Sequence, residues 1–240
     1  FEKGKSAGSC QLNLVGLGIL DLKAGNAKEA KAKFDLAVKN SPKKDAKILV
    51  AIARAYYTVD GVKYAKEIGD FIKKARKNNK TESATPILEG DMAAAEANTG
   101  DAQGMYDEAI SYDPTNSEPY VKYARALFKV NPQQAISRLQ DLLAQNPTSA
   151  LAQRELAEKF YENDQWTKAA EQYGEYIKNP NHFKQDEVRY ASLLFYGKKY
   201  NESLDLARKI EASLPATDKN VFYMKRLELY NLKKKKKWED

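Results

Sequence analysis

The side chains best suited to nucleophilic or metal chemistry are scarce in this chain. Among 240 residues there is one cysteine, Cys10, and one histidine, His182. A disulfide within the chain needs two cysteines, and ordinary zinc sites need several cysteine or histidine ligands. A serine or cysteine nucleophile would depend on His182, which follows the turn-like sequence Asn-Pro-Asn and is interpreted as a loop histidine. We therefore predict no metal site, no cofactor and no such nucleophile.

Two further patterns could support enzyme chemistry. The sequence Val-Gly-Leu-Gly at 15–18 could begin a phosphate-binding loop, but no third glycine follows and no strand precedes it. Glu155 and Glu158 lie one turn apart on a predicted helix and could act as acid and base. Such carboxylate pairs arise by chance in a chain in which 30% of the residues are charged. No Walker loop, Gly-x-Ser-x-Gly or His-Glu-x-x-His motif occurs, so we predict a protein without enzymatic activity.

The pattern that would position these residues is helical. Apolar residues make up 42% of the chain, with only 8 Pro and 12 Gly, so it can bury a core. Strand-like alternation does not recur, whereas apolar residues at three- and four-residue spacing recur throughout, for example at 27–38 and 166–177. The longest apolar stretch, 12–22, is about half the length that a membrane-spanning helix needs. We predict an all-α fold without a membrane span.

The helical pattern repeats with a period of about 34 residues. Counted from Gly18 and from Gly90, an alanine, an aromatic residue, a second alanine and a proline recur at the same offsets of 12, 16, 19 and 24. They are Ala30, Phe34, Ala37 and Pro42 in one copy and Ala102, Tyr106, Ala109 and Pro114 in another. Small residues allow two helices to cross closely, and the proline ends the second helix of each pair.

This pattern resembles the tetratricopeptide repeat (TPR) family over nearly the whole chain. The resemblance implies a right-handed α-solenoid, in which antiparallel helix pairs stack into a superhelix with a concave inner surface. The second copy requires extra residues near Asp60, and Ser203 and Ala207 depart from the expected alanine and aromatic residue. The predicted copies are 11–43, 45–80, 83–116, 117–149, 150–183 and 184–217, followed by a truncated seventh at 218–240.

The resemblance also implies a scaffold that binds a protein or peptide partner in a groove lined by the first helix of each pair. The predicted groove residues are Val15, Ile19, Arg54, Tyr57, Asp91, Arg125, Phe128, Arg154, Glu158, Tyr161 and Phe195. Some family members hold a partner's terminal carboxylate with lysine and asparagine at groove positions, where this chain has Val15 and Ile19. The alternative is a carbohydrate or cell-envelope polymer module with Tyr57, Phe128, Tyr161 and Phe195 as sugar platforms.

Charge is segregated along the chain. Residues 1–80 hold 18 Lys and Arg against 8 Asp and Glu, whereas residues 81–120 hold 9 Asp and Glu and no Lys or Arg. Such bands either hold neighbouring repeats in register or steer a partner that carries both signs, and both interpretations stay open. Nucleic acid is disfavoured because its phosphates would have to pass the acidic band. We expect a protein partner of mixed charge rather than a small molecule.

The two ends of the sequence support further expectations. The chain begins with Phe1 and shows no basic-then-apolar leader, which is therefore absent or already removed. The compartment stays open between the cytoplasm and the cell envelope or periplasm, with the envelope preferred. The run from Lys233 to Lys237 could attract an anionic partner but is interpreted as an exposed turn. Trp238 resembles the start of a second helix, which predicts that the native chain continues beyond Asp240.

Overall fold

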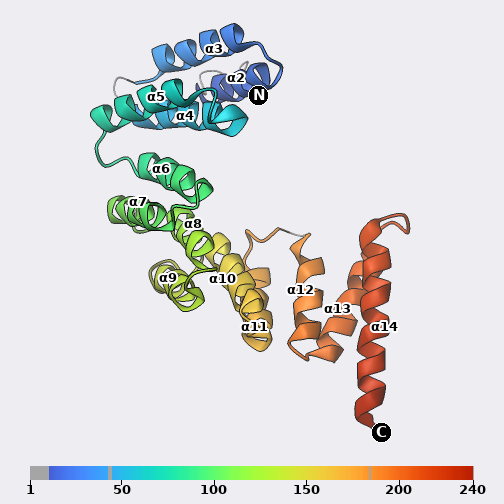
Figure 1. The fold of residues 1–240 in the computed structure, drawn as a ribbon. Helices are drawn as coiled ribbons and strands as arrows, with labels where there is room; N and C mark the ends of the chain where they lie inside the picture. The colour runs from blue at the N-terminus through green and yellow to red at the C-terminus, as the bar shows by residue number, and fades with distance from the viewer. Residues whose placement is uncertain (1–10, 43–44, 184, 240) are drawn as a thin grey trace. The chain divides into compact units, whose positions relative to one another are not determined.

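The computed structural model describes residues 11–42, 45–183 and 185–239. These residues form thirteen α-helices and no strand (Figure 1). The helices are α2 (Gln11–Lys23), α3 (Ala27–Asn40), α4 (Ala46–Asp60), α5 (Ala65–Asn78), α6 (Ala84–Ala95), α7 (Thr99–Tyr112), α8 (Ser117–Leu127), α9 (Pro132–Gln145), α10 (Ala150–Glu162), α11 (Trp166–Lys178), α12 (Asp186–Tyr196), α13 (Tyr200–Ser213) and α14 (Lys219–Glu239). The predicted all-α fold is confirmed. None of these helices is both long and apolar enough to cross a bilayer.

The chain divides into two compact units, 1–114 and 115–240, called unit 1 and unit 2 below. Unit 1 contains α2 to α7 and unit 2 contains α8 to α14. Within each unit the most extensive contacts join consecutive helices, such as α2 with α3 and α10 with α11. The first helices of successive pairs also touch, α2 with α4 and α4 with α6 in unit 1, and α8 with α10 in unit 2, where α12 likewise touches α14. We call the surface that these first helices form in each unit its first-helix surface.

The small residue on the first helix makes room for the aromatic residue on the second. A β-carbon added to Gly90 on α6 would lie only 2.6 Å from the ring of Tyr106 on α7. A β-carbon on Gly18 would collide with the ring of Phe34 in the same way. Both rings are at most 2% exposed. The aromatic residue recurs 16 positions after the glycine because its ring fills the space that the missing side chain leaves between the two helices.

Four of the turns within helix pairs use the same backbone device. Gly25, Ala97, Asp164 and Lys198 have positive φ values of 56° to 84°. In each turn the N–H of the next residue donates to the carbonyl oxygen five residues before it, over 2.8 to 2.9 Å. This left-handed residue with a long backward hydrogen bond is the usual way to end a helix sharply, and glycine adopts it at least cost.

Replacing Lys198 with glycine is expected to stabilise the protein. The left-handed conformation costs a residue with a β-carbon about 1 kcal/mol or more. Glycine avoids this cost but loses more backbone entropy on folding, which offsets part of the gain. The net gain in the free energy of unfolding should be about 0.5 to 1 kcal/mol, seen as a higher urea midpoint. Lys198→Ala keeps the β-carbon and should leave the midpoint unchanged. Equal midpoints for the two variants would show that the turn carries no strain.

The C-terminal helix corrects two sequence predictions. Helix α14 runs without a break through Lys233 to Lys237, so the predicted exposed turn is wrong. Trp238 lies inside the same helix and does not open another one. Lysine is a good helix former and no Gly or Pro follows Lys219, so nothing in the sequence ends the helix there. The assignment of 218–240 to a truncated repeat stays a prediction.

Candidate partner-binding surface

The predicted groove residues lie on or next to the first helices of both units. In unit 1, Val15 and Ile19 lie on α2, Arg54 and Tyr57 on α4, and Asp91 on α6. In unit 2, Arg125 lies on α8 with Phe128 just beyond it, Arg154, Glu158 and Tyr161 on α10, and Phe195 on α12. Val15 is only 4% exposed and belongs to the hydrophobic core of unit 1. The others are half-buried or exposed, and their contact with a partner stays a prediction.

In unit 1 the charged groove residues Arg54 and Asp91 belong to one polar network. Arg54 Nη1 lies 3.8 Å from Asp91 Oδ2, and the Tyr106 hydroxyl donates a 3.0 Å hydrogen bond to Asp91 Oδ1. Burial raises the pKa of Tyr106 well above its usual range, and the negative charge of Asp91 adds to the rise. The pKa of Tyr57 is raised by burial and then by Asp91 and Glu96. These groups therefore hold α4, α6 and α7 together.

Arg76 on α5, which the sequence analysis missed, joins the basic and acidic segments. Its guanidinium donates to both carboxylate oxygens of Glu89 on α6 and to those of Glu108 on α7, at 2.9 and 3.0 Å for Glu108. The Tyr112 hydroxyl donates a further 2.6 Å hydrogen bond to Glu108. Three carboxylates of the acidic band, those of Glu89, Asp91 and Glu108, thus pair with arginines of the basic segment. These contacts favour register between repeats as the role of the opposite charges.

Arg76→Gln is expected to lower the free energy of unfolding by about 1 to 2 kcal/mol at neutral pH, the range for hydrogen bonds to charged groups at a partly exposed site. The hydrogen bond from Arg76 lowers the pKa of Glu108 below its ordinary value of 4.5. A carboxyl with a lowered folded pKa stabilises the protein above its unfolded pKa and loses this effect as the pH falls through the folded pKa. The difference in urea midpoint between Arg76→Gln and the parent should therefore shrink in acid.

Lys73→Gln provides the matched control for that comparison. Lys73 is exposed on the same helix, and among the described residues it forms no ion pair. Its replacement should leave the midpoint unchanged at both neutral and acidic pH. If Arg76→Gln lowers the free energy of unfolding by the same amount in acid as at neutral pH, Arg76 does not lower the pKa of Glu108.

In unit 2 three arginine–carboxylate pairs connect successive first helices. Arg125 Nη2 lies 2.6 Å from Glu155 Oε2, which joins α8 to α10. Arg154 Nε lies 2.7 Å from Asp186 Oδ2, and Arg189 Nη2 lies 2.8 Å from Glu158 Oε2, which join α10 to α12. Each pair spans 30 to 32 residues, close to the repeat period. The sequence analysis missed Glu155 as an ion-pair partner, and it missed Asp186 and Arg189 altogether.

The predicted aromatic residues of unit 2 have neighbours on their ring faces. Lys159 Nζ lies 4.7 Å from the centre of the Phe128 ring, and Arg189 Cζ lies 4.3 Å from the centre of the Tyr161 ring. Both distances are those of cation–π contacts. Phe195 packs against tyrosine rings at 5.6 to 6.2 Å between centres. These rings are Tyr196, Tyr200 and Tyr230.

A pocket of about 240 Å³ opens between α12 and α14 beside Phe195. It is lined by Ser192, Phe195, Tyr196, Tyr223, Arg226, Leu227 and Tyr230. Arg226 Nε donates a 2.9 Å hydrogen bond to the Tyr230 hydroxyl, but no carboxylate in the described part of the chain pairs with this guanidinium. The pKa of Tyr196 is raised by the nearby Tyr161 hydroxyl and then by burial. The pocket therefore combines aromatic walls, hydroxyl groups and a cation that has no carboxylate partner among the residues that the structure describes.

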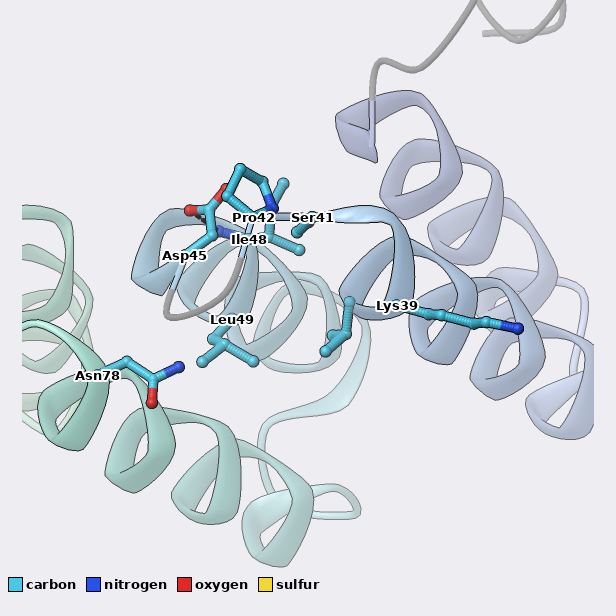
Figure 2. Close-up of a pocket in the computed structure, with 8 residues that line it drawn as sticks. Lys39, Ser41, Pro42, Asp45, Ile48, Leu49 and Asn78 are labelled. Atoms are coloured by element: carbon cyan, nitrogen blue, oxygen red, sulfur yellow. Dashed lines mark hydrogen bonds between the residues drawn. The ribbon is translucent and has the colours of Figure 1, made fainter.

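A second pocket, of about 210 Å³, lies at the connection between α3 and α4 (Figure 2). Pro42 and Asp45 group on one side of it, Asn78 of α5 lies on the other, and Lys39 extends its ammonium away from them. Asp45 is occupied as the cap of α4, because its carboxylate accepts the N–H of Lys47 at 3.0 Å. Residues 43–44, which join Pro42 to Asp45 in the sequence, are not described, and we assign this pocket no role.

The residues considered for enzyme chemistry have structural neighbours. Glu155 and Glu158 are ion-paired with Arg125 and Arg189, and Glu155 is only 5% exposed. His182 lies in the connection before α12, where its Nδ1 is 2.7 Å from the backbone oxygen of Asn179. Cys10 lies outside the described residues. Within 11–42, 45–183 and 185–239, no three His, Cys, Asp or Glu side chains gather as a metal site would require.

Comparison with known proteins shows the fold. No family model matches the sequence, and no curated protein matches it. PilW, described as a widely conserved type IV pilus biogenesis factor, is 15% identical with a TM-score of 0.62, and the match covers 90% of this chain and 99% of PilW. Yeast Tom70 is 19% identical with a TM-score of 0.66, over 92% of this chain and 46% of Tom70. YrrB, described as a TPR protein with an unusual peptide-binding site, is 16% identical with a TM-score of 0.50, and the match covers 83% of this chain and 97% of YrrB.

These matches define the class of protein. The chain has the fold of the tetratricopeptide repeat proteins, an all-helical solenoid of antiparallel helix pairs. The fold that the repeat pattern predicted is therefore confirmed. Because the identities lie between 15% and 19%, the likeness extends to the fold and not to the chemistry of any one surface.

Proposed function

We propose that this chain is a non-enzymatic scaffold that binds a protein or peptide partner on its first-helix surface, with α10, α12 and α14 of unit 2 as the main contact. The observation that carries the proposal is the pocket beside Phe195, whose lining combines three tyrosine rings with Arg226. Aromatic residues and arginine are the usual anchors of protein interfaces. The description of YrrB as a protein with a peptide-binding site supports a similar use of the fold here.

The aromatic residues favour a protein partner over a sugar. A sugar platform needs a ring face that is free to stack on the ligand. The faces of Phe128 and Tyr161 already carry Lys159 and Arg189 at 4.7 and 4.3 Å. A polypeptide can use the same surface differently, because it can place a carboxylate against the cations and an apolar side chain beside the rings.

The charges of unit 2 favour a partner that carries both signs. Glu158 and Arg189 are partly exposed on the first-helix surface, with 23% and 32% of their side chains accessible. A partner can therefore meet charges of either sign within a short distance, while Arg226 offers a place for one carboxylate. Nucleic acid stays disfavoured because its phosphates would lie against Glu158 as well as against the arginines.

The proposal is tested by association kinetics with a partner isolated from the source cells. The association rate should fall as salt is added, because charges steer the encounter. Arg226→Gln should lower both the rate and its salt dependence. Lys209→Gln, which removes a charge from the exposed part of α13, is the control and should change neither. A rate that is independent of salt, or equal losses for the two variants, would contradict the proposed surface.

A further inference from the structure

Unit 1 contains a larger pocket, of about 490 Å³, between the second helices α3 and α5. None of the predicted groove residues lines it, so its role is independent of the proposed function. The pocket lies where the repeat spacing changes. The starts of α4 and α5 are 19 residues apart, against 14 to 16 for the other pairs. The extra residues place Tyr64 directly before α5, where its ring packs against that of Tyr56 on α4.

The floor of this pocket is a cluster of four aromatic rings. Tyr56 lies at its centre, with ring centres 5.1 Å from Phe34, 5.0 Å from Tyr64 and 6.2 Å from Phe71. Phe34, Tyr56 and Tyr64 are at most 7% exposed, and Phe71 is half-buried. Of the four rings, Phe71 therefore offers the most surface to the cavity, and the face of an aromatic ring attracts a cation.

The rim of the pocket carries both signs, with Lys28, Lys31 and Lys74 beside Asp35, Glu67 and Asp70. Asp35 is paired with Lys31 at 2.7 Å, whereas Glu67 and Asp70 form no ion pair among the described residues. Burial raises the pKa of Tyr56 to about 12, and the negative charges of Glu67 and Asp35 add to the rise. Glu67 and Asp70 are exposed, so their carboxylates are accessible to a cation from outside.

One lysine already shows what the pocket attracts. Lys74 Nζ lies 5.4 Å from the centre of the Phe71 ring, within the range of a cation–π contact. Lys74 is exposed and flexible, so another cation can displace it. A guanidinium fits this site better than an ammonium, because it is planar, stacks on aromatic rings and donates two parallel hydrogen bonds to a carboxylate.

We propose that this pocket receives an arginine side chain of a protein partner, with the guanidinium against Phe71 and its N–H groups toward Glu67 and Asp70. The pocket gives the chain a second contact surface on its second helices. It would be used by a partner with an exposed arginine, whatever binds the first-helix surface.

The test uses N-acetyl-arginine methylamide as probe, titrated into the whole chain while side-chain NMR signals of Tyr64 and Phe71 are followed. The same compound with citrulline in place of arginine is the control, because citrulline keeps the length and shape but carries a neutral urea. Saturable shifts at Tyr64 and Phe71 with the arginine compound alone are expected. Equal shifts with both compounds, or none with either, would overturn the proposal.

Three exposed side chains on this surface give variants that should fold normally. Glu67→Gln is expected to weaken binding of the arginine probe about two- to fivefold, the range for one exposed cation contact. Lys74→Gln should strengthen it, because it removes a competing cation. Glu29→Gln removes an exposed carboxylate of α3 that does not line the pocket and should change nothing. If Glu67→Gln and Lys74→Gln change the affinity in the same direction, the proposal is wrong.

Discussion

Gly90→Leu is expected to lower the free energy of unfolding by about 3 kcal/mol, the upper part of the range for overpacking a core. A β-carbon alone would lie 2.6 Å from Tyr106, and the rest of the leucine side chain would force the ring away. The ring cannot move without loss, because its hydroxyl donates to Asp91 at 3.0 Å. Urea or thermal unfolding monitored by circular dichroism measures the effect.

Gly104→Ala is the matched control, because Gly104 lies on α7 of the same helix pair. A β-carbon there would meet no atom within 4 Å. The variant should be more stable than the parent by about 0.5 to 1 kcal/mol, since alanine favours the helix over glycine. The two glycines therefore predict effects of opposite sign. An unchanged midpoint for Gly90→Leu would show that the close contact of α6 with α7 does not require a glycine at position 90.

Replacing both Phe128 and Tyr161 with alanine is expected to weaken partner binding by more than about 2 kcal/mol, the scale of interface hot spots. Both rings hold cationic side chains in place, Lys159 over Phe128 and Arg189 over Tyr161. Their loss would remove apolar contact area and also loosen these two charges. The dissociation rate should rise more than the association rate falls, because short-range contacts determine how long a complex lasts.

The control for the aromatic variant is the double replacement of Phe183 and Phe222. These rings are 60% and 74% exposed in unit 2 and do not line the pocket between α12 and α14. Their removal should leave the affinity and the helical content unchanged. If the Phe128 and Tyr161 variant keeps its helical content and still binds as tightly as the parent, the partner does not use these anchors.

The sequence predicts the fold well because packing rules recur in it. The apolar stripes at 27–38 and 166–177 correspond to α3 and α11. The aromatic residue 16 positions after Gly18 and after Gly90 packs against that glycine where the two helices of the pair cross. Such rules depend on residues within one helix pair, so the linear spacing contains them.

The surface is harder to predict because its contacts join different helix pairs. The pairs of Arg125 with Glu155 and of Arg189 with Glu158 depend on how successive first helices stack. Opposite charges about 31 residues apart were the available signal, and a search at the repeat period would have found them. The error at Lys233 has another cause, because its expected position between the two helices of a seventh repeat suggested a turn where helix propensity prevailed.

The central claim, that a protein partner contacts the first-helix surface of unit 2, is tested most directly by photo-crosslinking in the source cells. A photoreactive phenylalanine analogue is placed at Tyr196 or Tyr223 in the pocket, and at Phe183 or Phe222 as controls. The account predicts a discrete adduct with another polypeptide from the two pocket positions and none from the controls. Adducts from the control positions alone, or no adduct from either pocket position, would contradict it.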